Sequence, residues 1–240
     1  MNSFPGLVIK AVIPAFDEEQ AIAGVIANAP AFLTEIIVVD NGSRDRTASI
    51  AASAGARVVA EPRRGYGRAC KTGIANAGRC DIILFMDADG ADDPRDAHWL
   101  VAPIAAGEAD LVIGSRALGT AEKGALTLPQ RWGNALACWL IVRFWGVAYT
   151  DLGPFRAISA KALTRLSMDD DAYGWTVEMQ ARAAKLDLRV REVPAAYRKR
   201  IGRSKISGTV NGVLRAGSTI LYVICRERLR DSPLVRRRGS

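Results

Sequence analysis

Short apolar runs alternate with longer amphipathic segments through the first half of the chain. Apolar runs of this length are too short for helices and are typical of strands buried on both faces. Predicted strands lie at residues 7–13, 36–39, 57–60, 82–86 and 111–115. Because these strands alternate with helical segments and polar loops follow them, the sequence predicts an α/β fold with a mostly parallel, doubly wound sheet flanked by helices.

The fourth apolar run ends in a cluster of acidic residues: Asp87, Asp89, Asp92 and Asp93. Open α/β sheets bind their ligands at the carboxyl ends of the strands. Asp87 and Asp89 lie two residues apart, so in extended backbone they point the same way and can share one hard cation. Mg²⁺ or Mn²⁺ held in this way leaves positions for substrate phosphates. The alternative is a polar loop with Gly90 as its turn residue.

Two other predicted strand-to-helix loops carry polar groups. Asp40 follows the second strand, where acidic residues of nucleotide-binding α/β folds accept hydrogen bonds from a base or ribose. In the loop at residues 61–67, Gly65 and Gly67 allow close backbone approach, and Arg63 and Arg64 can meet a diphosphate. The same loop can also be a simple turn with a solvated edge.

Length and charge narrow the class of protein. The 240 residues suit one sizeable domain, and the net charge of +8 fits nucleic acid, anionic lipid or phosphorylated substrates. No zinc-ligand spacing or aromatic RNA-binding signature supports nucleic acid, so we expect no such partner. The four cysteines form no CxxC pair, which favours free thiols in a reducing compartment. We find no signal peptide and no apolar run long enough to cross a bilayer.

Four motifs in the first half resemble family 2 glycosyltransferases. They are Val-Ile-Pro-Ala-Phe-Asp-Glu-Glu at 12–19, Val-Val-Asp-Asn-Gly-Ser-Arg-Asp at 38–45, Arg-Gly-Tyr-Gly at 64–67 and Met-Asp-Ala-Asp-Gly at 86–90. They occur in the order that the family has. The resemblance implies the GT-A fold, a nucleotide-diphosphate sugar as donor, and a divalent cation, Mg²⁺ or Mn²⁺.

The second half is similar to the branch that makes polyprenyl- and dolichyl-phosphate sugars. The similarity rests on residues 114–116, 130–134, 151–156 and 198–208, and overall it covers roughly residues 8–225. It implies inverting transfer from a UDP- or GDP-linked sugar to a lipid phosphate. Two positions depart from the branch: Ala91 stands where a glutamine often binds the metal, and Gly153-Pro154 replaces Ser-Gly. At the first, Asp92 or water can substitute as a ligand.

The resemblance also implies roles for individual residues. Asp40 would face the nucleotide base, Asp87 the ribose or the metal, and Asp89 the metal. Arg116 and Arg131 would bind the acceptor phosphate. The other residues expected to bind the nucleotide sugar are Pro14, Ala15, Phe16, Glu18, Gly65, Gly67, Ala88, Arg156, Arg203 and Lys205, with the last two closing over the diphosphate.

The acceptor decides whether a catalytic base is needed. A hydroxyl acceptor must lose its proton to a base, whereas a lipid phosphate is already anionic and needs cations to position it. Glu178 lies where related hydroxyl-transferring enzymes keep a catalytic acid, but it can equally pair with Arg182 at i+4. A glycosyltransferase acting on a soluble hydroxyl acceptor, with Glu178 as base, is therefore one alternative. A non-catalytic nucleotide- or lipid-binding module is another.

Two helical segments suggest contact with a membrane. Residues 132–149 hold Trp132, Trp139 and Trp145, and an apolar stripe over residues 208–225 is followed by a run of arginines. Indoles at headgroup level and a basic cluster both suit an anionic membrane surface. Ordinary core helices and a disordered basic tail explain the same pattern.

We therefore expect a single domain over residues 1–225, ending in an amphipathic helix. Its nucleotide-binding half would cover residues 7–116 and its acceptor-side half residues 117–225, with a flexible basic tail at 226–240. The expected location is the cytoplasm, peripherally on the inner face of the membrane. The sequence leaves the oligomeric state, the donor base and the sugar open.

Overall fold

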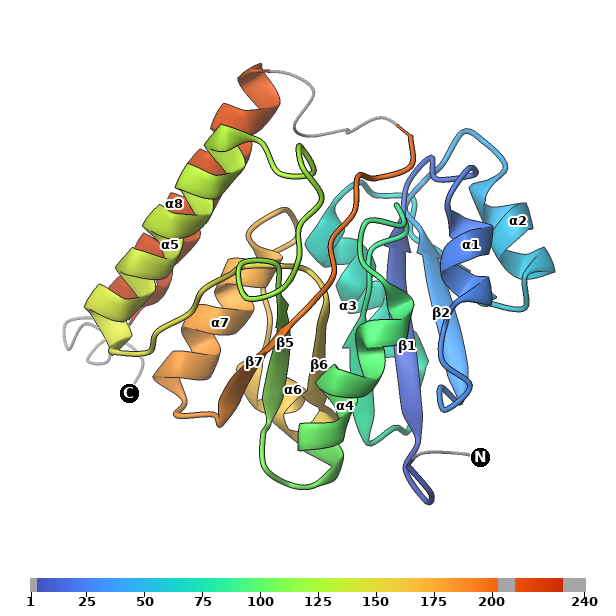
Figure 1. The fold of residues 1–240 in the computed structure, drawn as a ribbon, viewed down its shortest axis with the longest axis horizontal. Coiled ribbons are helices and arrows are strands. Elements are labelled where there is room, and N and C mark those ends of the chain that lie inside the picture. Colours follow the sequence, from blue (N-terminus) through green and yellow to red (C-terminus); the bar gives the residue numbers. More distant parts are fainter. Residues whose placement is uncertain (1–3, 203–209, 231–240) are drawn as a thin grey trace.

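In a computed structural model, which describes residues 4–202 and 210–230, the strands form one mixed sheet in the order β3-β2-β1-β4-β6-β5-β7 (Figure 1). Strand β6 is antiparallel to both of its neighbours, and the other strand pairs are parallel. The predicted fold class is confirmed. The strands are β1 (Ile9–Ala15), β2 (Glu35–Asp40), β3 (Arg57–Ala60), β4 (Ile82–Phe85), β5 (Leu111–Ser115), β6 (Arg156–Ser159) and β7 (Val190–Pro194).

Helices cover both faces of the sheet, which is why its central strands are apolar on both sides. All four residues of β4 are buried. One face packs against α1 (Ile22–Ala27), α2 (Thr47–Ser53) and α4 (Ala97–Ala105), the last preceded by a 3₁₀ turn, η1 (Pro94–Asp96). The other face packs against α3 (Tyr66–Ala77), α6 (Ala160–Leu166) and α7 (Trp175–Lys185).

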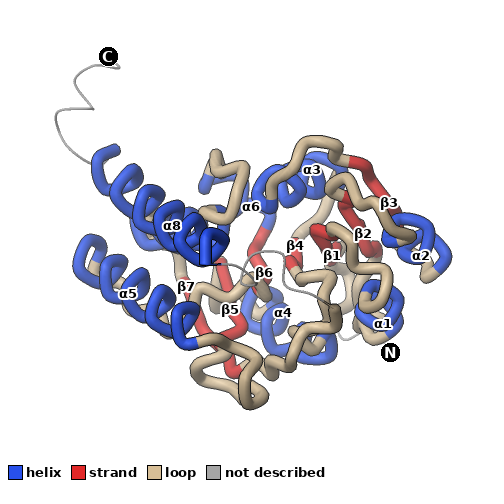
Figure 2. Tube along the Cα trace, turned by 90° about the horizontal axis from the view of Figure 1, so that it is seen from above, coloured by secondary structure: helices blue, strands red, loops and turns tan. Residues whose placement is uncertain are grey.

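Two long helices, α5 (Leu128–Trp145) and α8 (Val210–Arg230), lie side by side beyond α7 in both views (Figures 1 and 2). Helix α5 starts earlier than its tryptophans indicated, because Thr127 and Gln130 form a capping box. It stops at Gly146, which has φ of 74°, a left-handed conformation that glycine adopts without strain. In the described part of the chain, no helix combines the length and the apolar character needed to cross a bilayer.

Two further boundaries differ from the prediction. Pro14 was expected to end the first strand, but β1 continues through it to Ala15, with Pro14 opposite Val39 of β2. Pairing with β4 ends earlier, at Val12, so Pro14 has a strand neighbour on one side only.

The expected flexible tail does not begin at residue 226, because α8 continues to Arg230. Arg226 pairs with Glu178 of α7, and Arg230 with Asp169. Charged partners therefore extend the helix beyond the end of the apolar stripe. The rest of the predicted tail, residues 231–240, lies outside the described residues.

Candidate functional site

A cavity of about 430 Å³ opens at the carboxyl ends of β1 and β4. From β1 the chain moves outward to β2 and β3, and it then returns to form β4 on the other side of β1. Such a reversal of strand order is where open α/β sheets bind ligands. We call this the switch-point cavity; its lining residues are Pro14, Ala15, Phe16, Glu18, Asn41, Arg64, Gly65, Tyr66, Ala69, Asp87, Ala88, Asp89, Tyr173 and Arg200.

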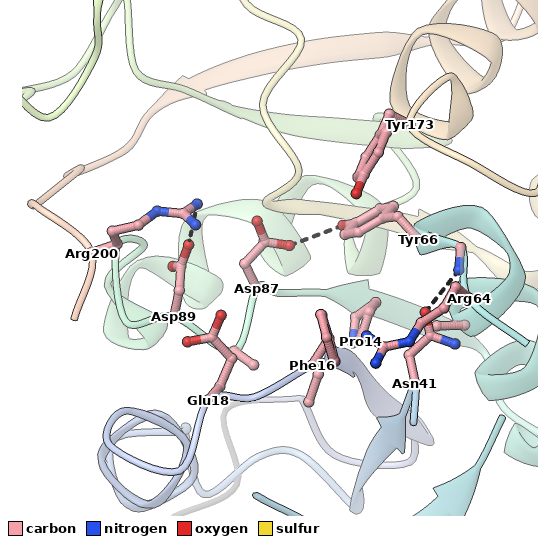
Figure 3. Close-up of a pocket in the computed structure, with 14 residues that line it drawn as sticks. Pro14, Phe16, Glu18, Asn41, Arg64, Tyr66, Asp87, Asp89, Tyr173 and Arg200 are labelled. Atoms are coloured by element: carbon pink, nitrogen blue, oxygen red, sulfur yellow. Dashed lines mark hydrogen bonds and ion pairs between the residues drawn. The ribbon is translucent and has the colours of Figure 1, made fainter. Parts of the chain in front are cut away.

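Asp87 and Asp89 lie next to each other in the middle of this cavity (Figure 3). Asp89 is buried; one of its oxygens accepts from the backbone N–H of Ala91 at 2.9 Å, and the other pairs with Arg200 at 2.6 Å. The hydroxyl of Tyr66 donates to Asp87 at 3.0 Å. Burial, together with the nearby charge of Asp89, raises the pKa of Asp87 to about 7. Two carboxylates this close together repel each other when both are ionised, and a bound cation would stabilise the ionised pair.

The pair fits a hard divalent cation that keeps several positions for substrate. Mg²⁺ is commonly held by one or two carboxylates plus phosphates and water. Within the described ranges, no group of three or more acidic, histidine or cysteine side chains is arranged to hold a metal. Asp92 is buried nearby with Oδ2 lacking a hydrogen-bond partner, but it is not among the lining residues. Phosphate or water, rather than a third side chain, would complete such a site.

The end of the cavity away from Arg200 is formed by Phe16, Arg64 and Asn41 (Figure 3). The guanidinium carbon of Arg64 lies 3.3 Å from the ring centroid of Phe16. The side chain of Asn41 holds the following loop in place. Its amide donates to the carbonyls of Glu61 at 2.9 Å and Arg63 at 2.8 Å, and its oxygen accepts from Gly65 at 2.9 Å. An aromatic ring with a guanidinium beside it is better suited to binding the base of a nucleoside than to binding a metal ion.

Asp40, predicted to face the base, is not among the lining residues; its neighbour Asn41 is. The carboxylate of Asp40 instead accepts a hydrogen bond from the backbone N–H of Ser43 at 3.1 Å. Both residues stand at the end of β2, and alternation along a strand lets only one of two neighbours point into the cavity.

Gly65 and Gly67 serve a different contact from the predicted one. A Cβ at Gly65 would collide with the carbonyl oxygen of Asp171, and one at Gly67 with that of Asp170. Gly67 also donates its N–H to the carbonyl of Ala172 at 3.0 Å. The glycines therefore allow close approach to residues 170–172 of the chain itself. Of the two, only Gly65 lines the switch-point cavity.

Arg156 is fully buried and is not among the residues that line the cavity, and its contact with the nucleotide sugar stays a prediction. Its guanidinium donates to the carbonyls of Thr176 at 3.0 Å and Leu152 at 3.3 Å, and also to that of Gly153. Burial lowers the pKa of Arg156 to about 10. This residue joins the start of β6 to α7. Two other predicted donor residues, Arg203 and Lys205, lie outside the described residues.

The two predicted acceptor arginines meet at a second cavity, of about 690 Å³, between β5 and α5, which we call the α5 cavity. Arg116 is largely committed to Asp151, with Nε and Nη2 each donating to that carboxylate at 2.7 Å. Its charge also lowers the pKa of Asp87. Arg131 is exposed in the first turns of α5.

Glu178 is not among the residues that line the switch-point cavity or the α5 cavity. Its side chain is 0% exposed. One carboxylate oxygen accepts from the backbone N–H groups of Asp169 at 3.1 Å and Asp170 at 2.9 Å. The other pairs with Arg226 at 2.5 Å and Arg182 at 3.0 Å. The predicted i+4 pair with Arg182 is therefore confirmed, and the geometry does not support Glu178 as a base.

Sequence reasoning missed Tyr66, Ala69, Tyr173 and Arg200 as lining residues. Arg200 belongs to the segment 198–208, which the sequence marked only as similar to the branch that makes lipid-phosphate sugars. It reaches Asp89 because residues 197–201 run alongside the acidic loop. Tyr197 bridges to Asp92, Arg198 donates its N–H to the carbonyl of Ala91 at 2.8 Å, and Ile201 donates to that of Asp89 at 2.9 Å.

Comparisons with known proteins agree with this geometry. The chain is 36% identical over 214 residues to an uncharacterized glycosyltransferase of Mycobacterium tuberculosis, covering 88% of this chain and 95% of that protein. It is 30% identical over 228 residues to a dolichyl-phosphate hexose transferase of Haloferax volcanii, covering 92% of this chain and 96% of that protein.

Among solved structures, the fold is similar to that of glucosyl-3-phosphoglycerate synthase from Mycobacterium tuberculosis. That crystal structure contains Mn²⁺, uridine-diphosphate-glucose and phosphoglyceric acid. The TM-score is 0.75 at 25% identity, over 95% of this chain and 82% of that chain. The model of Glycosyl transferase family 2 matches residues 10–165. Together with Asp87 and Asp89 at the end of β4 in the switch-point cavity, these matches show that the chain is a glycosyltransferase that belongs to family 2.

Proposed function

We propose that this enzyme moves a sugar from a UDP- or GDP-linked donor to a polyprenyl-phosphate-type acceptor, with inversion and with Mg²⁺ or Mn²⁺ bound. The observation that carries the donor half is the pair of adjacent carboxylates in the switch-point cavity, half-buried Asp87 and buried Asp89. The Mycobacterium tuberculosis synthase, solved with Mn²⁺ and uridine-diphosphate-glucose, supports the donor and the metal. The Haloferax volcanii transferase, by its name, supports a lipid-phosphate acceptor.

In this proposal Asp87 and Asp89 hold the metal, which acts as a Lewis acid toward the leaving diphosphate. The chain's own cations complete the site. Arg200 lines the same cavity and pairs with Asp89, so its guanidinium can transfer from the carboxylate to a phosphate. The nucleoside extends toward Phe16 and Arg64 at the other end, where a base can stack.

The acceptor half rests on the α5 cavity. A lipid phosphate is already anionic, which agrees with the position of Glu178 away from both cavities. Both arginines line this cavity: Arg131 is exposed, while Arg116 is held by Asp151. A phosphate oxygen attacking the anomeric carbon opposite the leaving diphosphate gives inversion.

The membrane proposal rests on an exposed apolar face of α5. Trp132 is 76% exposed and Trp139 60%, and they share this face with Leu128, Leu136 and Val142 at helical spacing. Trp139 and Val142 also line the α5 cavity, so an acceptor's hydrocarbon chain can lie along the helix while its phosphate enters. Large apolar side chains on a helix surface, with arginines nearby, suit peripheral binding to an anionic membrane on the cytoplasmic side.

Membrane binding is tested by co-sedimentation with vesicles. We expect binding to anionic vesicles to exceed binding to neutral ones and to weaken with salt, because charge is screened beyond a Debye length of about 8 Å at physiological ionic strength. The double change Trp132→Ser and Trp139→Ser should abolish most of it. Trp99→Ser is the matched control, since Trp99 is 60% exposed on α4. Equal losses from the two sets, or no preference for anionic lipid, would count against the proposal.

Arg131→Ala tests the acceptor phosphate site. Because Arg131 is exposed, its attraction to a phosphate is partly screened, and we expect the KM for a short-chain, water-soluble polyprenyl phosphate to rise roughly tenfold, about 1.4 kcal/mol. The KM for the sugar nucleotide should stay nearly the same. Arg143→Ala, in the last turn of the same helix, is the control. An unchanged acceptor KM in Arg131→Ala would remove this residue from the site.

A soluble phosphorylated acceptor is the second candidate, favoured by the phosphoglyceric acid in the similar crystal structure. Arg131 can bind a phosphate on either kind of molecule. The deciding experiment is a screen of UDP- and GDP-sugars with Mn²⁺, in which donor consumption is measured alone, with polyprenyl phosphate and with phosphoglycerate. Family membership argues against the non-catalytic alternative. Transfer to phosphoglycerate alone would replace the lipid acceptor, and consumption of no donor under any condition would overturn the proposed activity.

A further inference from the structure

The hydroxyl of Tyr66 contacts one of the two carboxylates on which the proposed function depends. Tyr66 is the first residue of α3, lines the switch-point cavity, and donates to Oδ1 of Asp87 at 3.0 Å. In Figure 3 its ring lies beside Asp87 and next to Tyr173, while Arg200 approaches Asp89 from the other side. The two carboxylates are therefore held by different partners.

We propose that Tyr66 is the positioning residue for Asp87. Its hydroxyl occupies Oδ1, fixes the plane of the carboxylate, and leaves Oδ2 available to the cation or the donor. This inference rests on the proposed metal-dependent function. It adds a tyrosine hydroxyl from outside the motif at residues 86–90 to the proposed metal site.

The backbone around Tyr66 is anchored so that the ring has a fixed place. Gly65 and Gly67, on either side of it, both pack against the carbonyls of residues 170–171 with no room for a Cβ. Gly67 and Arg68 donate their N–H groups to the carbonyls of Ala172 and Asp171, each at 3.0 Å. The side chain of Arg68 also pairs with Asp171. The glycine turn thus holds Tyr66 over Asp87.

Electrostatics explains why this donor matters. Asp87 is half-buried beside Asp89, and both features disfavour two separate anions. A buried carboxylate oxygen needs a hydrogen-bond donor, and a neutral phenol supplies one without adding a positive charge that would repel the cation.

Partners that orient metal ligands typically change metal affinity by 10–100-fold when they are removed. In Tyr66→Phe we therefore expect the Kd for Mn²⁺, measured on the full chain with UDP present by electron paramagnetic resonance of free Mn²⁺, to rise roughly tenfold. Phenylalanine keeps the ring, so the Tm should stay close to that of the wild type. That combination separates positioning from a general loss of structure.

Tyr149→Phe is the matched control, because the Tyr149 hydroxyl is also buried and donates to the carbonyl of Gln180 at 3.1 Å, away from the carboxylates. It should leave the Kd for Mn²⁺ unchanged. A Tyr66→Phe protein that binds Mn²⁺ as tightly as the wild type would overturn the role of Tyr66 alone. A wild-type chain that binds Mn²⁺ with neither UDP nor GDP would overturn the proposed metal-dependent function together with this inference.

Discussion

Replacing Asp89 by Asn should lower the rate of sugar transfer by at least about a hundredfold, the scale of losing one preorganised electrostatic group at a reacting centre. Asn keeps the size of the side chain but removes the charge that Asp89 presents to Arg200 and, in the proposed mechanism, to the metal. Asp87 alone would then have to hold the cation. The measurement is the initial rate of donor consumption at saturating Mn²⁺ and over a range of Mn²⁺ concentrations.

Asp93→Asn is the matched control, a loss of one carboxylate charge from the same loop. Asp93 pairs with Arg95 at 2.7 Å and Arg198 at 2.6 Å and is not among the residues that line the switch-point cavity. This variant should keep most of the activity. Full activity of the wild type in excess chelator, or an Asp89→Asn enzyme as active as Asp93→Asn, would rule out a metal held at Asp89.

Replacing Glu178 by Gln should reduce the free energy of unfolding by about 3 kcal/mol, the scale of breaking a buried ion pair. Both carboxylate oxygens of Glu178 face hydrogen-bond donors. These are the backbone N–H groups of Asp169 and Asp170 and the guanidinium groups of Arg182 and Arg226. The amide NH₂ of glutamine would face one of these donor groups and leave it unsatisfied. Chemical denaturation of the two proteins measures the loss.

Sugar transfer per folded molecule should change little in this variant, since Glu178 is outside the lining of both cavities. Glu108→Gln is the control: it breaks the exposed pair with Arg191, and such surface pairs contribute roughly 0–1 kcal/mol. If Glu178→Gln were as stable as the wild type but inactive, a general base would be required. The soluble hydroxyl acceptor would then become the better hypothesis.

The sequence alone predicted five of the seven strands that the structure describes, β1 to β5, and the carboxylate end of the site, because both depend on local pattern. An apolar run such as residues 82–86 has no stable place except a buried strand, and the loop after a parallel strand must lie at the ligand-binding edge. Asp87 and Asp89 follow β4 and therefore lie in the cavity at this edge. The order of the motifs added the family.

The same pattern could not assign every side chain at that edge. Whether Asp40 or Asn41 faces the cavity depends on the residue at which β2 leaves the sheet, and a shift of one position exchanges their directions. The roles of Gly65 and Gly67 depend on residues 170–171, which are remote in sequence and touch the turn only in the folded chain.

Tertiary structure alone decided the partners of the charged residues. A sequence shows neighbours at i+4, which is why the pair of Glu178 and Arg182 was foreseen, but it does not show that α8 brings Arg226 to the same carboxylate. It also does not show that Arg200 reaches Asp89, or that Arg156 is buried among backbone carbonyls. Long flexible side chains have many possible partners in an unfolded chain, and only the packing of distant segments selects one of them.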